Sequence, residues 1–89
     1  MTDGERWMEE LRAEGFTDLR VCPTPPAGSP EHTHDLHTVH VVLRGELVIE
    51  DDGGRRTYLP GDRVEFPANT THTAGTIGGD GEMIVGVKP

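Results

Sequence analysis

The stretch HTHDLHTVHVVLRG, residues 32–45, decides the fold expected for this chain. It is rich in Val and Thr and has no helical period, so it predicts a continuous strand over 32–43. Because successive side chains of a strand point to opposite faces, one face is expected to carry His32, His34, Thr38 and His40. His37 then points to the other face and is expected at the surface or, failing that, in a dimer contact.

The pair His32 and His34 indicates a metal site. Residues two apart on a strand are separated by about 6–7 Å and lie on the same side, so both imidazoles can reach one ion at about 2.0–2.2 Å from each ring nitrogen. A closed site needs at least one further ligand. His72, on a separate predicted strand, is the only histidine of the chain outside the 32–40 cluster.

The chain that carries these histidines is short and acidic. Its 89 residues predict a single domain, 1–89, and a chain of this length buries only roughly 60–65% of its unfolded surface. A bound metal, a dimer partner or both are therefore expected to add stability. Sixteen acidic against eight basic residues give a net charge of −8, which argues against nucleic-acid binding and against a polybasic membrane-surface protein.

Two features predict a cytoplasmic protein. The longest uninterrupted apolar run, 41–43, is far below the ~18 residues of a membrane span, and the acidic N-terminus MTDGERWMEE is unlike a secretory signal. A single cysteine, Cys22, forms no internal disulfide and is expected to be a small, partly buried thiol.

The N-terminal segment predicts a short helix over residues 3–14. Thr2 and Glu5 have the spacing of a capping box, and Gly15 suits the left-handed position that ends a helix. One stripe of this helix is apolar and carries Trp7, Met8 and Leu11. We expect this stripe to cover the open end of a barrel or a partner subunit, and we expect a homodimer.

From residue 18 onward the pattern is all β. Short runs rich in Val, Ile, Leu and Thr alternate with Gly, Pro, Asn and Asp clusters, which is typical of a sandwich or barrel. The predicted strands are 18–22, 32–43, 46–51, 55–59, 62–66, 70–76 and 82–87.

Two motifs within this region resemble those of the cupin superfamily. The first consists of H-x-H at 32–34, Thr38 and, after a six-residue gap, Gly45. The second, GDRVEFPANTTH at 61–72, has the family's fixed positions at Gly61, Pro67 and His72. The resemblance implies a small single-domain cupin of the cupin-2 type, in which residues 18–87 form a double-stranded β-helix, or jelly-roll barrel.

The resemblance also implies a ligand set for a divalent transition metal: His32, His34 and His72. Thr38 stands where the family usually has a glutamate ligand, while Asn69 replaces a glycine and Thr76 an asparagine. Three neutral imidazoles without the carboxylate leave the metal its full charge, as in some cupin dioxygenases. The metal is Fe, Zn, Mn, Ni or Cu, to be selected by geometry rather than affinity.

His40 is the candidate catalytic residue beyond the motif. Three roles are open: a fourth ligand in place of the missing glutamate at Thr38, an acid–base or metal-supporting residue, or a polar residue of the barrel wall. Glu65 and Glu82 are expected in solvent. The remaining cavity lining is expected to come from Val42, Val64, Phe66 and Ala74, with some of Leu47, Ile49, Tyr58 and Ile84.

These residues support two main functions. The first is a metal-dependent enzyme, a dioxygenase or isomerase, that acts on a small anionic or chelating organic molecule. The second is a non-catalytic module that binds or senses such a molecule. A structural barrel that has lost its metal is the remaining alternative.

Overall fold

A short helix, α1 (Asp3–Ala13), begins the chain and ends one residue earlier than predicted. The Oγ1 of Thr2 accepts a hydrogen bond from the Glu5 backbone N–H at 3.1 Å, and the Glu5 carboxylate accepts one from the Thr2 N–H at 3.4 Å. Gly15 follows with φ of 100°, the left-handed conformation in which helices commonly end. Both predicted boundary signals are therefore confirmed.

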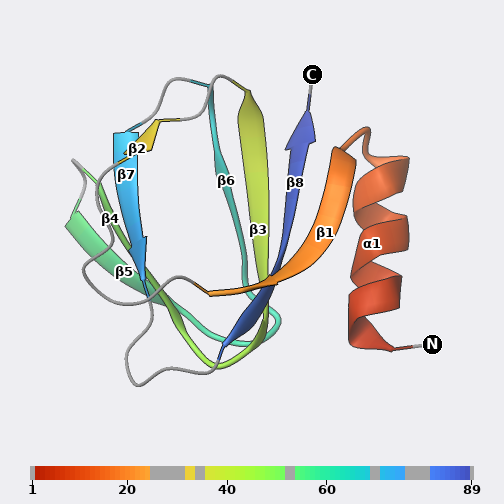
Figure 1. The fold of residues 1–89 in the computed structure, drawn as a ribbon, viewed down its shortest axis with the longest axis horizontal. Coiled ribbons are helices and arrows are strands. Elements are labelled where there is room, and N and C mark those ends of the chain that lie inside the picture. The colour runs from red at the N-terminus through yellow and green to blue at the C-terminus, as the bar shows by residue number, and fades with distance from the viewer. Residues whose placement is uncertain are drawn as a thin grey trace.

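The computed structural model describes residues 2–24, 32–33, 36–51, 54–68, 71–75 and 81–88, with the backbone alone at 32–33, 51 and 71–75. The strands are β1 (Thr17–Pro23), β2 (His32–Thr33), β3 (His37–Arg44), β4 (Leu47–Asp51), β5 (Gly54–Tyr58), β6 (Arg63–Phe66), β7 (Thr71–Gly75) and β8 (Glu82–Lys88). Within these residues they form two four-stranded sheets, ordered β1-β8-β3-β6 and β2-β7-β4-β5. Figure 1 shows the sheets facing each other, with α1 beside β1. In this described part, no helix has the length and apolarity that a membrane span requires.

The continuous strand predicted over 32–43 is two strands. β2 belongs to one sheet and β3 to the other, and Leu36 lies in a bend before β3. The prediction failed because the break holds no glycine or proline, and its one turn-favouring residue, Asp35, is a weaker signal. His32 and His40 therefore lie on different strands and do not share the face of one strand, contrary to the prediction.

β3 buries both of its faces. Side chains at even positions point between the sheets and meet β4, β6 and β8 in an inner cluster of Val42, Leu47, Ile49, Phe66 and Met83. Side chains at odd positions point outward and join an outer cluster of Leu11, Phe16, Val39, Val41 and Ile84. A strand buried on both faces reads as an almost continuous apolar run, as Val39–Leu43 does apart from His40.

Helix α1 covers the outer face of the β1-β8-β3-β6 sheet. Leu11 is fully buried in the outer cluster, with Trp7 and Met8 packed against it. The expectation that this stripe covers the open end of the barrel or a partner subunit is therefore wrong. The physical reason lies in β3 and β8, whose outward residues Val41 and Ile84 are apolar and require cover from within the chain.

Candidate functional site

The backbone brings two of the three predicted metal-ligand positions together. β2 pairs antiparallel with β7, and His32 lies opposite His72 in the register. Cross-strand partners in such a ladder have Cα atoms about 4.5–5.5 Å apart. The side chains of both histidines lie outside what the structure describes, as does the whole of His34. The pairing of β2 with β7 was not predicted, because sequence periodicity carries no information on which strands are neighbours.

Thr38, at the family's glutamate position, is buried in the barrel. It is 1% exposed and lies between Phe66 on β6 and Val87 on β8. Its Oγ1 makes no hydrogen bond to any residue that the structure describes. Leaving a buried hydroxyl in this state costs about 1–3 kcal/mol, so it marks a place where a polar ligand would be favourable. Asn69 and Thr76, the other two departures from the family pattern, lie outside the described residues.

His40 is a buried histidine on the inner face of β3. It is 5% exposed and lies opposite Val64 of β6 and Val85 of β8. Its ring meets Phe66 edge-on, with ring centroids 5.6 Å apart and planes at 77°. The alternation of β3 therefore brings His40 and Thr38 into the same interior as the inner cluster, as the sequence predicted for these two residues.

The inner cluster supplies an apolar lining from both sheets. The expected lining residues found in it or packed against it are Val42, Leu47, Ile49, Tyr58, Val64 and Phe66. Ile84 was expected as a possible lining residue and lies instead in the outer cluster. β8 is apolar at successive positions, so its sequence does not tell whether the odd-numbered or the even-numbered side chains face inward. In the structure, Met83 and Val85 face inward. The side chain of Ala74 lies outside the described part.

The Cupin domain family matches residues 20–86 of this sequence. The chain belongs to the cupin family. Since this match covers most of the chain and includes both histidine motifs, it confirms the resemblance and the all-β double-stranded β-helix. A comparison with curated proteins gave no match.

Solved structures place the chain among small cupins. A protein of unknown function from Rhizobium leguminosarum is 25% identical with a TM-score of 0.71, over 80% of this chain and 68% of that one. An RmlC-like cupin with a double-stranded β-helix fold from Methanocaldococcus jannaschii is 20% identical with a TM-score of 0.71, over 84% and 72% of the two chains. A predicted oxalate decarboxylase from Thermotoga maritima is 23% identical with a TM-score of 0.68, over 90% and 72%.

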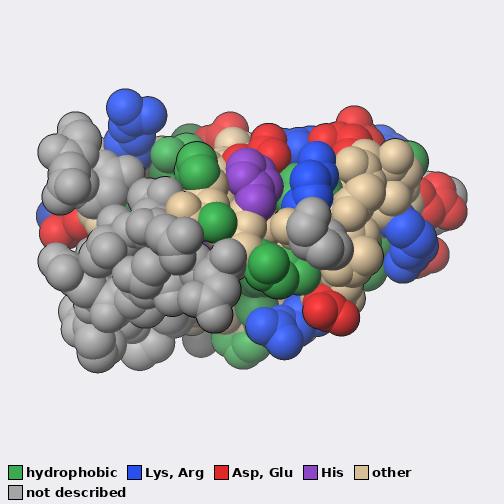
Figure 2. All heavy atoms as spheres, turned by 90° about the horizontal axis from the view of Figure 1, so that it is seen from above, with side chains coloured by type: hydrophobic (Ala, Val, Ile, Leu, Met, Phe, Trp, Pro, Cys, Tyr) green, Lys and Arg blue, Asp and Glu red, His purple; other side chains and the backbone are tan. Residues whose placement is uncertain are grey.

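The outer face of the cupin barrel carries an ionic network. His37 Nε2 lies 2.9 Å from Glu65, and Arg63 contacts Glu65 at 3.0 Å and Glu14 at 2.6 Å. Figure 2, seen from above the view of Figure 1, shows a histidine beside acidic and basic side chains. The hydrogen bond with His37, helped by the Arg63 guanidinium, lowers the pKa of Glu65, and the Arg63 hydrogen bond lowers that of Glu14.

Ion pairs hold the two surface carboxylates of the prediction. Glu65 and Glu82 were expected in solvent; both are partly exposed, but each holds a cationic partner, Glu82 through Arg44 at 3.0 Å. His37 lies on the outward face of β3, as its parity predicted, at 32% side-chain exposure. None of these three side chains points into the barrel interior, so they contribute no ligand there.

Proposed function

We propose that this cupin holds a divalent transition metal on His32, His34 and His72 and receives a small anionic or chelating organic molecule in its barrel. The register of His32 against His72 is the observation that carries the proposal. His34 follows His32 by two residues, so a third imidazole is available from the same segment. Histidine nitrogens suit Fe, Zn, Ni and Cu, whereas Mn, the remaining candidate, prefers oxygen ligands.

The buried residues of the barrel interior are compatible with a metal that holds a bound ligand. Thr38, which is buried on the inner face of β3, provides a hydroxyl rather than a carboxylate. With three neutral ligands the ion keeps its full charge, and it supplies Lewis acidity and an open coordination position. A carboxylate, thiolate or enolate is the matching chemistry, and the apolar inner cluster excludes water from it.

His40 is proposed to exchange a proton with the bound molecule or to support a ligand. Among the described side chains, the buried polar ones are Thr24, Thr38 and His40, so the acid–base group that the described residues bury is His40. Its ring packs on Phe66, which fixes the imidazole in the interior. This role is compatible with dioxygenase-like or isomerase chemistry.

A non-catalytic binding module is the second candidate. The described part of the interior buries Thr38 and His40 in an otherwise apolar lining. Such an interior can bind or sense a small molecule without transforming it. A structural barrel without metal is the remaining outcome of the same tests.

One experiment separates these functions. The protein is reconstituted anaerobically with Fe(II), mixed with a thiol, a diketone or a flavonol, and exposed to oxygen in an oxygen electrode. Oxygen consumption with product formation supports the enzyme. Tight binding with the compound recovered unchanged supports the module. A protein that takes up no metal under these conditions would contradict the proposed site.

We also propose that the cupin forms a homodimer. β1 is an edge strand of its sheet, and Val21 on it is 45% exposed. Edge strands with unpaired backbone groups need cover. Helix α1 gives no reason to form a dimer, because its Leu11 is already buried within its own chain. Light scattering at micromolar concentration is expected to give twice the 9.7 kDa chain mass. A monomer mass would contradict this.

A further inference from the structure

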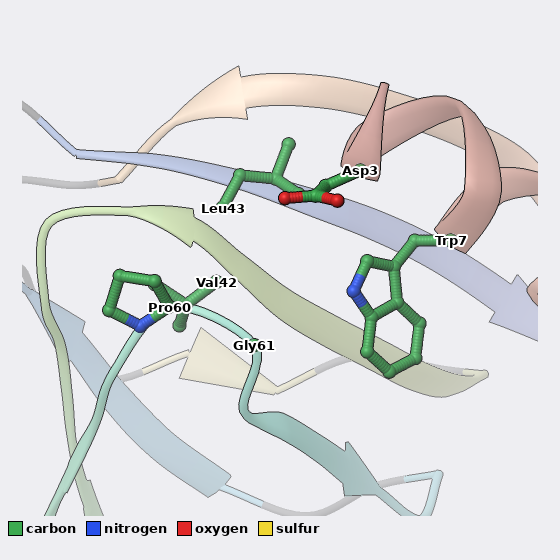
Figure 3. Close-up of a pocket in the computed structure, with 6 residues that line it drawn as sticks. All are labelled: Asp3, Trp7, Val42, Leu43, Pro60 and Gly61. Atoms are coloured by element: carbon green, nitrogen blue, oxygen red, sulfur yellow. The ribbon is translucent and has the colours of Figure 1, made fainter. Parts of the chain in front are cut away.

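A pocket of about 290 Å³ lies beside the first turn of α1 (Figure 3). Its lining comes from α1, from β3 and from the turn before β6: Asp3, Trp7, Val42, Leu43, Pro60 and Gly61. Pockets for drug-sized ligands begin at about 300 Å³, so this one suits a smaller molecule. It uses none of the proposed metal ligands.

Both walls of the pocket are held in place by hydrogen bonds. The capping box of Thr2 and Glu5 fixes the first turn of α1. On the other side, the Gly61 N–H donates to the Val42 carbonyl at 2.9 Å, and the Val42 N–H donates to the Asp62 carbonyl at 3.0 Å. A pocket whose walls are fixed in advance loses less entropy when a ligand binds.

The charges around the pocket favour a cation. Asp3 lines it, and Glu5 lies in the same helical turn. Arg6 and the helix N-terminus, which contributes about half a positive charge, offset part of this negative charge, and the two carboxylates still outweigh them. The chain as a whole carries a net charge of −8, which adds to the negative potential.

The remaining lining groups define the rest of the ligand. Figure 3 shows the indole of Trp7 with its nitrogen edge toward the Pro60–Gly61 side, below the Asp3 carboxylate. An indole nitrogen only donates hydrogen bonds, so it requires an acceptor on the ligand. Leu43 and Pro60 offer apolar contact for a short carbon chain.

We propose that this pocket binds a small primary amine that also carries a hydroxyl or carbonyl oxygen. The ammonium group pairs with the Asp3 carboxylate, and the oxygen accepts a hydrogen bond from the Trp7 indole. Because such a molecule has few atoms, its Kd is expected in the millimolar range.

The test uses 3-aminopropan-1-ol and its neutral counterpart propane-1,3-diol, which differ only in ammonium against hydroxyl. Trp7 is the chain's one tryptophan, so intrinsic fluorescence reports directly on the pocket. Saturable quenching or enhancement is expected with the amine and not with the diol. Asp3→Asn is expected to weaken binding about two- to fivefold, because Asp3 is exposed and its ion pair with the ammonium group is screened by solvent.

Glu9→Gln is the matched control, because Glu9 is exposed on the same helix and does not line the pocket. It is expected to leave the affinity unchanged, and circular dichroism checks that both variants keep their helix. Equal binding of the diol, or equal weakening by both variants, would overturn the proposal. Binding that survives Asp3→Asn and disappears after metal chelation would also overturn it, by assigning the amine to the barrel.

Discussion

The two faces of β3 bury different chemistry. The outward face places Val39 and Val41 under α1 in a cluster that is apolar throughout, with its ionic groups confined to the rim. The inward face buries Thr38 and His40 together with apolar Val42. Apolar burial on the outer face stabilises the fold, whereas the Thr38 Oγ1, buried on the inner face without a hydrogen bond to any described residue, costs free energy unless a ligand satisfies it. Both apolar clusters therefore stabilise the fold, and the described polar side chains that β3 buries lie on its inner face.

The largest expected effect separates histidines of the two faces. His72→Ala removes a proposed ligand, so purified protein is expected to lose most of its stoichiometric metal. His37→Ala removes an imidazole that pairs with Glu65 on the outer face, and metal content is expected to stay unchanged. Elemental analysis of freshly purified protein measures both. Equal metal content in the wild type and His72→Ala would remove the metal site from the account.

A matched pair of leucines then tests whether the inner cluster affects ligand binding and the outer cluster does not. Leu11 in the outer cluster and Leu47 in the inner cluster are both fully buried, so each Leu→Ala change is expected to lower the free energy of unfolding by about 2–5 kcal/mol. Denaturant unfolding followed by circular dichroism measures this loss. Only Leu47→Ala is expected to alter ligand affinity in the folded fraction. If Leu11→Ala weakened ligand binding as much, the comparison between the faces would fail.

His40→Gln tests the interior histidine. The variant keeps a polar side chain of similar length, and turnover or ligand binding is expected to fall about 100-fold while metal stays bound. A parallel loss of metal would instead make His40 a fourth ligand. Metal analysis and a binding or turnover assay on one preparation distinguish these results. Unchanged function with unchanged metal would reduce His40 to a residue of the barrel wall.

The smallest effect concerns the outer rim. Glu65 has a lowered pKa in the folded state, so its stabilising effect is complete above the unfolded value near 4.5 and is lost as the pH falls through the folded pKa. Glu65→Gln is expected to cost about half a kcal/mol at pH 6, because the side chain is 37% exposed and screened by solvent. The difference from wild type should shrink below pH 4.5. A constant difference down to pH 2 would argue against the ionic origin.

Local chemistry made the helix and the parity of β3 predictable. The Thr2–Glu5 capping box marks the start of the helix, and Gly15 marks its end. Each signal lies within one helical turn of the boundary that it sets, so it can be recognised in the sequence. Alternation likewise placed Thr38 and His40 on one face, because side chains within an unbroken strand follow a fixed period. The motif spacing from His32 to His72 gave the cupin fold, since the glycines and histidines at fixed separations are particular to that family.

Long-range relations were not predictable in the same way. Nothing at Leu36 marks the bend that separates β2 from β3, and no periodicity shows that β2 pairs with β7. The position of α1 had a signal that was not used: Val39, Val41 and Leu43 are apolar on the face opposite His40, so the outer face of the sheet needed cover. The pairing of Glu65 with His37 depends on the β3–β6 neighbourhood, which the sequence alone does not give.

The most direct test is a crystal structure of protein purified without added metal, with anomalous scattering data. The account predicts an anomalous peak inside the barrel, with ring nitrogens of His32, His34 and His72 about 2.0–2.2 Å from it. Rings that point away from one another, or a bound metal held by none of these three, would contradict the account and leave the barrel interior without its proposed chemistry.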